Sequence, residues 1–229
     1  KKYKIITALS MFYDLKNPHS FVRGIVKILH KEGIFVLEHA DLLSIIKNCC
    51  FDTICHEHLE YYSSNIIINL MKLNKLRVFD IKPNSINGGS MRYFICHNDS
   101  KYMNNQKIIF SILNQEKKLK LDSIKTYYNF FKKINKVKIK LRDLLKAITN
   151  KKLTIHGYGA STKGNVLLQF FKIDRNILEF IADRNPLKVN SYTPGSKFII
   201  KSEKFSRKLN PDFYLVLPWH FKNEILKRE

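Results

Sequence analysis

Apolar and polar residues alternate along the first hundred positions in blocks that predict strands and helices in turn. Residues 5–10 and 33–39 form short apolar runs suited to buried strands, and residues 20–29 place apolar side chains at helical spacing. The same reasoning predicts further elements: a short helix over 42–47, a loop over 49–59, a helix over 64–73, and strands over 76–81 and 90–97. This alternation indicates an α/β unit.

A second α/β unit follows a long lysine-rich stretch. Residues 98–107 are polar and predict a loop, and residues 108–149 carry apolar side chains three and four positions apart, as a helix would. The segments beyond predict strands over 153–156, 178–182 and 213–217, with a helix over 163–171. We therefore expect three parts: residues 1–105, a helical linker over 106–150, and a parallel-sheet domain over 151–229.

The chain carries a large positive charge. It has 41 lysines and arginines against 19 aspartates and glutamates, a formal net charge of +22. Such a charge favours anionic partners, so a basic nucleic-acid-binding module is one alternative. The lysines are scattered among asparagine and isoleucine without a compact basic motif, which indicates a compositional bias and makes nucleic acid the weaker expectation. No apolar run is long enough to span a membrane, so we expect no membrane partner.

The cysteine pattern gives no sign of a metal site. Cys49, Cys50, Cys55 and Cys96 form no Cys-x-x-Cys pair, and their spacing builds no standard zinc site, so we predict no metal. The chain shows no secretory signal pattern. Free thiols in a cytoplasmic protein are therefore the expectation.

Titratable residues are densest around His56-Glu57-His58, with Asp52 before the triplet and Glu60 after it. Histidine titrates near neutral pH, and a neighbouring carboxylate can orient it, so the triplet is a candidate for proton transfer. The spacing is not that of the His-Glu-x-x-His metalloprotease motif. The alternative interpretation is a solvated polar turn.

A glycine-bearing turn opens the second α/β unit. Gly157-Tyr158-Gly159 follows a predicted strand and precedes a predicted helix, and Asp183 stands about 20 positions later, as in the dinucleotide fingerprint. Thr162 stands where that fingerprint has its third glycine. Three interpretations stay open: a nicotinamide-dinucleotide-binding module of oxidoreductase type, an anion site at the helix N-terminus, or glycines that only allow close packing.

Several segments, taken in order, resemble S-adenosylmethionine-dependent C-methyltransferases that act on nucleotide-linked keto-sugars. The central one is Phe51-Asp-Thr-Ile-Cys-His-Glu-His-Leu-Glu-Tyr-Tyr-Ser63. The others are residues 12–22, 87–92, 156–165, 183–188, 193–195 and 217–221. The resemblance covers nearly the whole chain, and ordered motifs over this length are more specific than any one of them.

The resemblance implies a fold and a division of labour. Residues 1–105 would form a partial Rossmann-like methyltransferase sheet with its catalytic loop, followed by the helical linker and a second Rossmann-like parallel α/β domain. A complete member of the family begins with a cysteine-rich zinc domain and a glycine loop for S-adenosylmethionine, and neither is in this chain. We therefore expect a fragment, truncated at its end as well. Its cofactor-binding residues would lie mostly upstream of Lys1, zinc would occur only in the missing domain, and the isolated chain would be inactive.

The resemblance also implies roles for single residues in deoxysugar biosynthesis. His58 matches the base that removes a proton next to the sugar's ketone, and Glu57 matches a neighbouring acid, with His56 beside them. Two departures bear on the substrate: Cys55 stands where a tyrosine is usual and Asp14 where a histidine is common. A thiol is a poorer hydrogen-bond donor than a phenol. The partner would be a nucleotide-diphosphate sugar, with contacts from Asn87, Gly88, Gly89, Arg92, Gly157, Tyr158, Gly159, Lys163 and Asn165.

Overall fold

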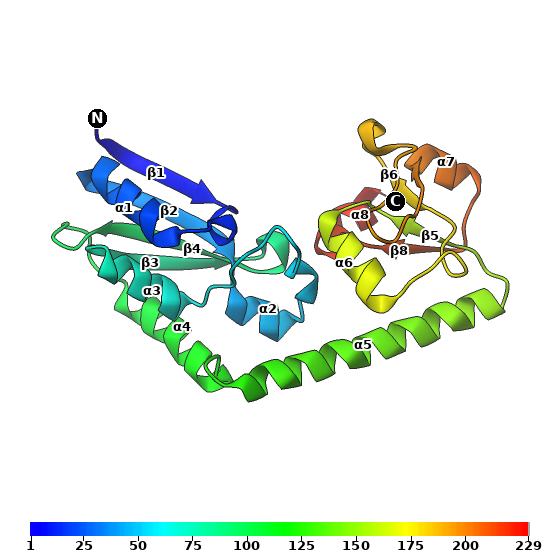
Figure 1. Cartoon of the computed structure of the whole chain (residues 1–229), viewed down its shortest axis with the longest axis horizontal. Helices are drawn as coiled ribbons and strands as arrows, with labels where there is room; N and C mark the ends of the chain where they lie inside the picture. Colours follow the sequence, from blue (N-terminus) through cyan, green and yellow to red (C-terminus); the bar gives the residue numbers. More distant parts are fainter. Residues whose placement is uncertain (229) are drawn as a thin grey trace. The chain divides into compact units, whose positions relative to one another are not determined.

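The computed structural model describes residues 1–228 and divides the chain into two compact units. The first holds residues 1–51 and 56–130, and the second holds residues 52–55 together with the chain from residue 131 onward. Each has a sheet of its own (Figure 1). The predicted boundaries at residues 105 and 150 stay predictions.

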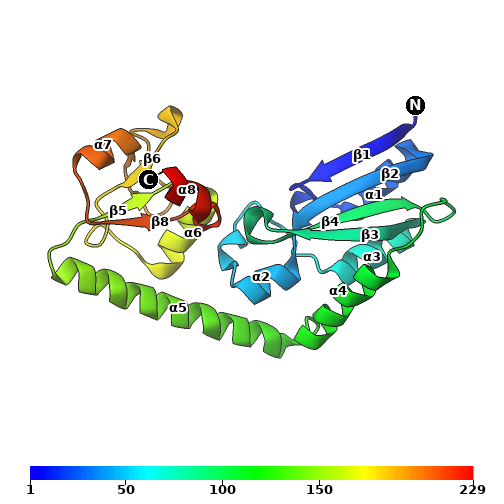
Figure 2. The same cartoon turned by 180° about the vertical axis from the view of Figure 1, so that it is seen from behind.

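The first unit is built on a mixed four-stranded sheet in the order β1-β2-β4-β3. Its strands are β1 (Tyr3–Leu9), β2 (Leu29–Ala40), β3 (Leu76–Asn84) and β4 (Ser90–His97). The strands β1 and β2 are parallel, whereas β4 runs antiparallel to both of its neighbours. Figure 2 shows the four strands side by side.

Helix α1 (Pro18–Ile28) makes the crossover between the two parallel strands. Its start follows from the sequence, because the side chain of Asn17 accepts a hydrogen bond from the Ser20 N–H and Pro18 occupies the first turn. Helices α2 (Leu42–Asn48) and α3 (Ser64–Leu73) are capped in the same way by Asp41 and Ser63.

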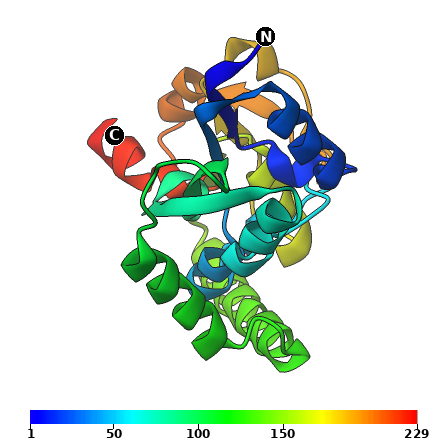
Figure 3. The same ribbon diagram turned by 90° about the vertical axis from the view of Figure 1, so that its left-hand side faces the viewer.

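One apolar cluster joins the helices to the sheet. Val22 of α1, Ile67 of α3 and Ile112 of α4 (Gln106–Leu119) pack with Phe35 and Tyr93 of the strands, and all five are essentially buried. Because these side chains share one cluster, α1, α3 and α4 pack with the sheet around one core, with α4 along the β3 side (Figure 3).

The second unit has a fully parallel sheet in the order β7-β6-β5-β8. Its strands are β5 (Ile155–Tyr158), β6 (Ile181–Asp183), β7 (Ile200–Ser202) and β8 (Phe213–Val216), and its shorter helices are α6 (Thr162–Phe171), α7 (Glu203–Lys208) and α8 (Lys222–Arg228). The prediction of an α/β fold with Rossmann-like sheets is confirmed, including the parallel sheet of the second half. None of the helices described is long and apolar enough to cross a membrane.

The helical stretch predicted for residues 108–149 is interrupted. Helix α4 ends at Leu119, Lys120 adopts a left-handed conformation, and α5 (Ile124–Asn150) begins four residues later. The Thr126 hydroxyl donates to the carbonyls of Leu119 and Lys120 and holds this turn. The predicted helical stretch is therefore two helices separated at residues 120–123, where the last carbonyls of α4 are satisfied locally.

Candidate active site

The histidine loop, residues 55–60, is fastened to the carboxyl end of β1. The backbone carbonyl of Tyr13, in the short helix η1 (Phe12–Asp14) just after β1, accepts hydrogen bonds from the N–H groups of Leu59 at 2.9 Å and Glu60 at 3.2 Å. In α/β proteins the carboxyl ends of parallel strands form the usual ligand-binding edge. The loop therefore lies at the edge of the β1–β2 pair where chemistry is expected.

Within this loop only one of the two histidines is held by packing. The ring centroid of His58 lies 4.2 Å from that of the buried Tyr13, and the Tyr61 hydroxyl donates to the His58 carbonyl at 3.4 Å. In contrast, the His56 side chain is 85% exposed and lies 4.0 Å from the carboxylate of the exposed Glu57. The structure thus distinguishes the half-buried and oriented His58 from the exposed His56, in agreement with the role that the resemblance implies for His58.

Two further predicted residues, Cys55 at the start of this loop and Asp14 next to it, belong to the same region. Cys55 is half-buried and begins the turn that carries His56 and Glu57. Asp14 is exposed and directly follows Tyr13, the residue against which His58 packs. Cys55, Glu57 and His58 therefore lie in the histidine loop itself. Asp14 lies in the short helix η1, to which the loop is hydrogen-bonded.

The Gly88-Gly89 segment meets the same edge from the other side of β2. The Gly89 carbonyl accepts from the Asp41 N–H at 3.3 Å, and the Gly88 carbonyl accepts from the Asn48 side-chain amide at 3.1 Å. Gly89 has φ +138°, and a Cβ there would lie 2.5 Å from the Ser44 Cβ. Glycine is therefore required for packing on α2 and turning into β4, whatever else the segment does.

Arg92, predicted to contact substrate, is paired with a buried carboxylate. It faces Glu38 across the β2–β4 register, and its Nε donates to the Glu38 carboxylate at 2.5 Å. Asn87, at the tip of the turn, is half-buried and has a left-handed backbone. The ion pair gives Arg92 a structural role, and the substrate contacts of Asn87 and Arg92 stay predictions.

At the end of β2 lies a buried polar cluster, which the sequence analysis did not single out. His39 stacks on Tyr93 with centroids 5.3 Å apart, and its Nδ1 donates to the Ala40 carbonyl at 2.8 Å. Burial lowers the pKa of His39 to about 4, so the ring is neutral, with Nε2 as an acceptor. Burial also raises the pKa of Asp41 to about 6, although the Ser44 N–H and hydroxyl bind its carboxylate.

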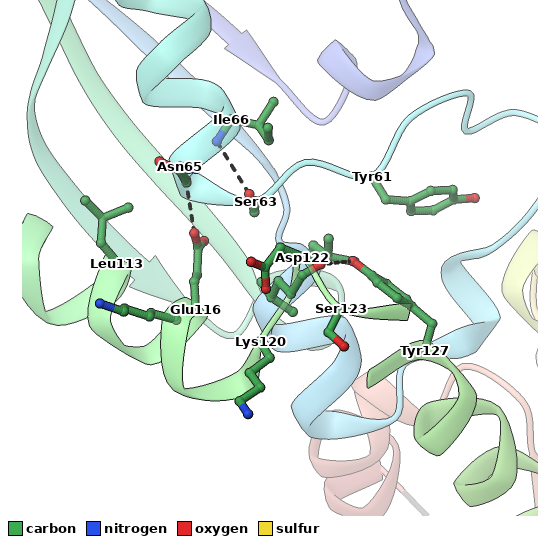
Figure 4. Close-up of a pocket in the computed structure, with 13 residues that line it drawn as sticks. Tyr61, Ser63, Asn65, Ile66, Leu113, Glu116, Lys120, Asp122, Ser123 and Tyr127 are labelled. Carbon is green, nitrogen blue, oxygen red and sulfur yellow. Dashed lines mark hydrogen bonds between the residues drawn. The ribbon is translucent and has the colours of Figure 1, made fainter. Parts of the chain in front are cut away.

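A cleft of about 1090 Å³ opens beside the histidine loop in the same unit (Figure 4). Tyr61 lines it, together with residues of α3, α4 and the turn before α5. Glu116 points from α4 toward the start of α3, where its carboxylate accepts from the N–H groups of Ser64 at 2.6 Å and Asn65 at 3.1 Å. Glu116 therefore caps α3, since its two carboxylate oxygens bind N–H groups that have no partner within the helix.

In the second unit, neighbouring side chains pack directly against the glycine turn, residues 157–159. A Cβ on Gly157 would lie 2.2 Å from the Ile181 side chain, and one on Gly159, which has φ +86°, would lie 2.6 Å from the Pro218 ring. The Gly159 N–H already donates to the Ala182 carbonyl at 2.7 Å. These distances favour the interpretation that the glycines allow close packing.

The acidic residue after the glycine turn is also engaged. The carboxylate of Asp183 accepts from the Ala160 N–H at 2.7 Å and the Asn185 N–H at 2.8 Å, and Lys188 lies 3.8 Å away. A dinucleotide-binding domain offers this carboxylate to the ribose hydroxyls. Its use inside the turn weighs against the nicotinamide alternative.

Three predicted substrate residues remain around the start of α6. Tyr158 is buried and its hydroxyl accepts from Arg228. Lys163 is half-buried, and burial, followed by the nearby charge of Lys163, lowers the pKa of His220. The side-chain oxygen of Asn165 is buried and has no hydrogen-bond partner among the residues described, so it is the polar atom here that a ligand could satisfy.

Comparison with known proteins identifies the class. Residues 85–229 match the model of the C-methyltransferase C-terminal domain family, and the chain belongs to this family. It is 28% identical over 226 residues to the C-methyltransferase NovU of Streptomyces niveus, covering 99% of this chain and 54% of that protein. The chain thus spans about half the length of this curated relative.

Likeness to solved structures is slight. LepI in complex with S-adenosylmethionine is 9% identical with a TM-score of 0.34, over 43% of this chain and 27% of that one. Magnesium protoporphyrin IX methyltransferase from Synechocystis PCC 6803, with bound S-adenosylhomocysteine, is 11% identical with a TM-score of 0.34, over 42% and 46%. The prediction of C-methyltransferase membership therefore rests on the family match and the relative, and it is confirmed on those grounds.

Proposed function

We propose that this chain supplies the catalytic loop and the sugar-binding domain of an S-adenosylmethionine-dependent C-methyltransferase acting on a nucleotide-linked keto-sugar. The observation that carries the proposal is the placement of His58, which is packed on Tyr13 at the carboxyl end of β1. The family match and the 28% identity to a C-methyltransferase support the reaction class. The assignment of a sugar nucleotide as the substrate rests on the resemblance of the sequence motifs.

In the proposed reaction, a nitrogen of the His58 ring takes the proton from the carbon next to the sugar's ketone. The enolate electrons would then form the new carbon–carbon bond to the methyl group of S-adenosylmethionine, whose methyl–sulfur bond breaks so that S-adenosylhomocysteine leaves with the electron pair. The segment Ser10–Asp14 at the end of β1, in which Ser10 and Asp14 are exposed, is the part of this chain that would lie beside the methyl donor. Glu57 is exposed and would orient a sugar hydroxyl or His58.

The second unit would hold the nucleotide part of the substrate. The buried oxygen of Asn165 would accept a hydrogen bond from the ligand, and Lys163 would meet a phosphate charge at the start of α6. The glycines would act indirectly, by letting β5 and α6 approach their neighbours. Binding of a thymidine-diphosphate sugar, NAD and a short oligonucleotide to the chain, measured side by side, separates this proposal from its two alternatives.

Replacement of His58 by asparagine tests the base. In the natural full-length protein, His58→Asn should lower methyl transfer by roughly a hundredfold or more, the scale of losing a positioned general base. His56→Asn is the matched control, because His56 lies two residues away and is mostly exposed. Solvent deuterium exchange into the sugar's α-carbon, measured without a methyl donor, reads the proton step alone.

The expected pattern is loss of exchange in His58→Asn and near-normal exchange in His56→Asn. Equal exchange in both variants would move the base elsewhere. Loss in the His56 variant alone would assign the proton transfer to the exposed histidine and contradict the packing argument.

A further inference from the structure

Three metal-ligating side chains of different type converge in the histidine loop. One ligand atom each from Cys55, Glu57 and His58 lies within 4.8 Å of the other two. Around a tetrahedral zinc ion, with bonds of roughly 2.0–2.3 Å, neighbouring ligand atoms stand roughly 3.3–3.8 Å apart. Small rotations of these side chains would therefore close them around one ion.

The chain itself produces this convergence. Residues 56 and 57 form a turn, which brings Cys55 and His58 to the same side and sends His56 into solvent. Since all three ligands come from four consecutive residues, the site needs only the local fold of the loop. The fixed spacings of known zinc motifs do not include this one, which is why the cysteine pattern predicted no metal.

The loop is also anchored and open. Tyr13 holds the ring of His58 and the backbone of Leu59 and Glu60, so part of the ordering that binding requires is already in place. Cys55 and His58 are partly exposed and Glu57 is exposed, so an ion can arrive from solvent. A sulfur, a nitrogen and an oxygen ligand suit Zn²⁺ better than the all-oxygen ions Mg²⁺ and Ca²⁺.

We propose that Cys55, Glu57 and His58 form a zinc site that switches the enzyme off. The Cys55 thiol releases its proton to solvent and binds as thiolate, Glu57 binds through a carboxylate oxygen, His58 binds through a ring nitrogen, and water takes the fourth position. The lone pair that His58 would use as a base is then engaged by the ion. This consequence for activity rests on the proposed function, whereas the binding itself does not.

Cobalt titration of the chain tests the site directly, because Co²⁺ bound by thiolate in a tetrahedral site absorbs in the near ultraviolet and the visible. We expect a thiolate-to-cobalt band that Zn²⁺ abolishes by displacement. Cys55→Ser should remove the band and weaken Zn²⁺ binding at least about tenfold, since even the loss of outer-shell partners commonly weakens metal binding by 10–100-fold. Cys49→Ser and His56→Gln are the matched controls and should keep the band.

A second measurement is independent of the cobalt spectrum. Zn²⁺ should slow alkylation of Cys55 by iodoacetamide, read by peptide mass spectrometry, and should leave the rate at the half-buried Cys49 unchanged. No thiolate band with the unsubstituted chain, or equal loss in Cys49→Ser and Cys55→Ser, would overturn the site. Because neither measurement involves methyl transfer, failure here is distinct from failure of the proposed function.

Discussion

The histidine loop and the glycine turn both contain residues typical of a functional motif, yet their polar groups are used differently. In the glycine turn, Ile181 and Pro218 leave no room for a side chain at Gly157 or Gly159. The Asp183 carboxylate accepts hydrogen bonds from backbone N–H groups of the same region. In the histidine loop, the backbone is anchored while the Glu57 side chain stays exposed. Motif residues indicate chemistry where the surrounding fold leaves their functional atoms available.

The largest effect should come from filling the glycine turn. Gly159→Val places a side chain against Pro218 at φ +86°, so overpacking and left-handed strain add. We expect the free energy of unfolding of the second unit to fall by about 2–5 kcal/mol. Urea-dependent hydrogen exchange of peptides from β5 and α6 measures it.

Gly24→Ala in α1 is the matched control for that substitution. Nothing among the described residues lies within 4 Å of a Cβ at Gly24, so this helical replacement should be neutral or stabilise by up to about 1 kcal/mol. If Gly159→Val were as harmless as Gly24→Ala, the packing interpretation of the turn would be wrong. Ligand binding, rather than packing, would then explain the glycine.

A second effect concerns His39 and Asp41 at the end of β2, because the pH dependences of their contributions to stability oppose each other. The folded-state pKa of His39 is lowered to about 4, so its contribution to stability is lost as pH falls from about 6.5 to 4. The folded-state pKa of Asp41 is raised to about 6, so its contribution is lost as pH rises from about 4 to 6. Each amounts to at most roughly 3 kcal/mol, and the two nearly cancel.

Asp41→Asn should reveal the pH dependence of stability that comes from His39. Asparagine still caps α2, so the fold is kept, but only the His39 contribution remains. The free energy of unfolding of the variant should rise between pH 4 and 6.5. In the unsubstituted chain, the summed contribution of His39 and Asp41 changes little over this range. Urea titrations across that range provide the measurement, and parallel curves for variant and parent would contradict the assignment.

The smallest effect tests whether the second unit binds the nucleotide near α6. Asn165→Ala should weaken binding of a thymidine-diphosphate sugar about tenfold, because the ligand loses a buried acceptor. Stability should change little, since that oxygen has no partner among the described residues. Calorimetry with Gln169→Ala as control, on the exposed side of the same helix, separates a specific contact from a general effect. Unchanged affinity would remove Asn165 from the proposed site.

Much of the fold was available from the sequence because its elements carry strong local signals. The helix Ser64–Leu73 and the strand Ser90–His97 have the bounds that their patterns predict, helped by the Ser63 cap and the Gly88-Gly89 break. The strand Ile200–Ser202 and the helix Glu203–Lys208 were missed. Three residues are too few for a periodic pattern, and pairing with β6 determines that strand.

The candidate site was predictable in composition but not in detail. The sequence located the titratable triplet, and the resemblance singled out His58, but the physical difference between the two histidines is the ring contact of His58 with Tyr13, 45 positions away. The shifted pKa values of His39 and Asp41 arise from burial by residues distant in sequence. Side chains that meet through tertiary packing leave no local pattern to find.

The chain has one tryptophan, and its position makes it an optical reporter. The indole N–H of Trp219 donates to the buried carboxylate of Asp52 at 2.8 Å, within the second unit, and Asp52 stands three residues before Cys55. Indole emission depends on the polarity and hydrogen bonding around the ring. The intrinsic fluorescence of this protein therefore reads out the segment that leads into the histidine loop, with no label attached and no second tryptophan to obscure the signal.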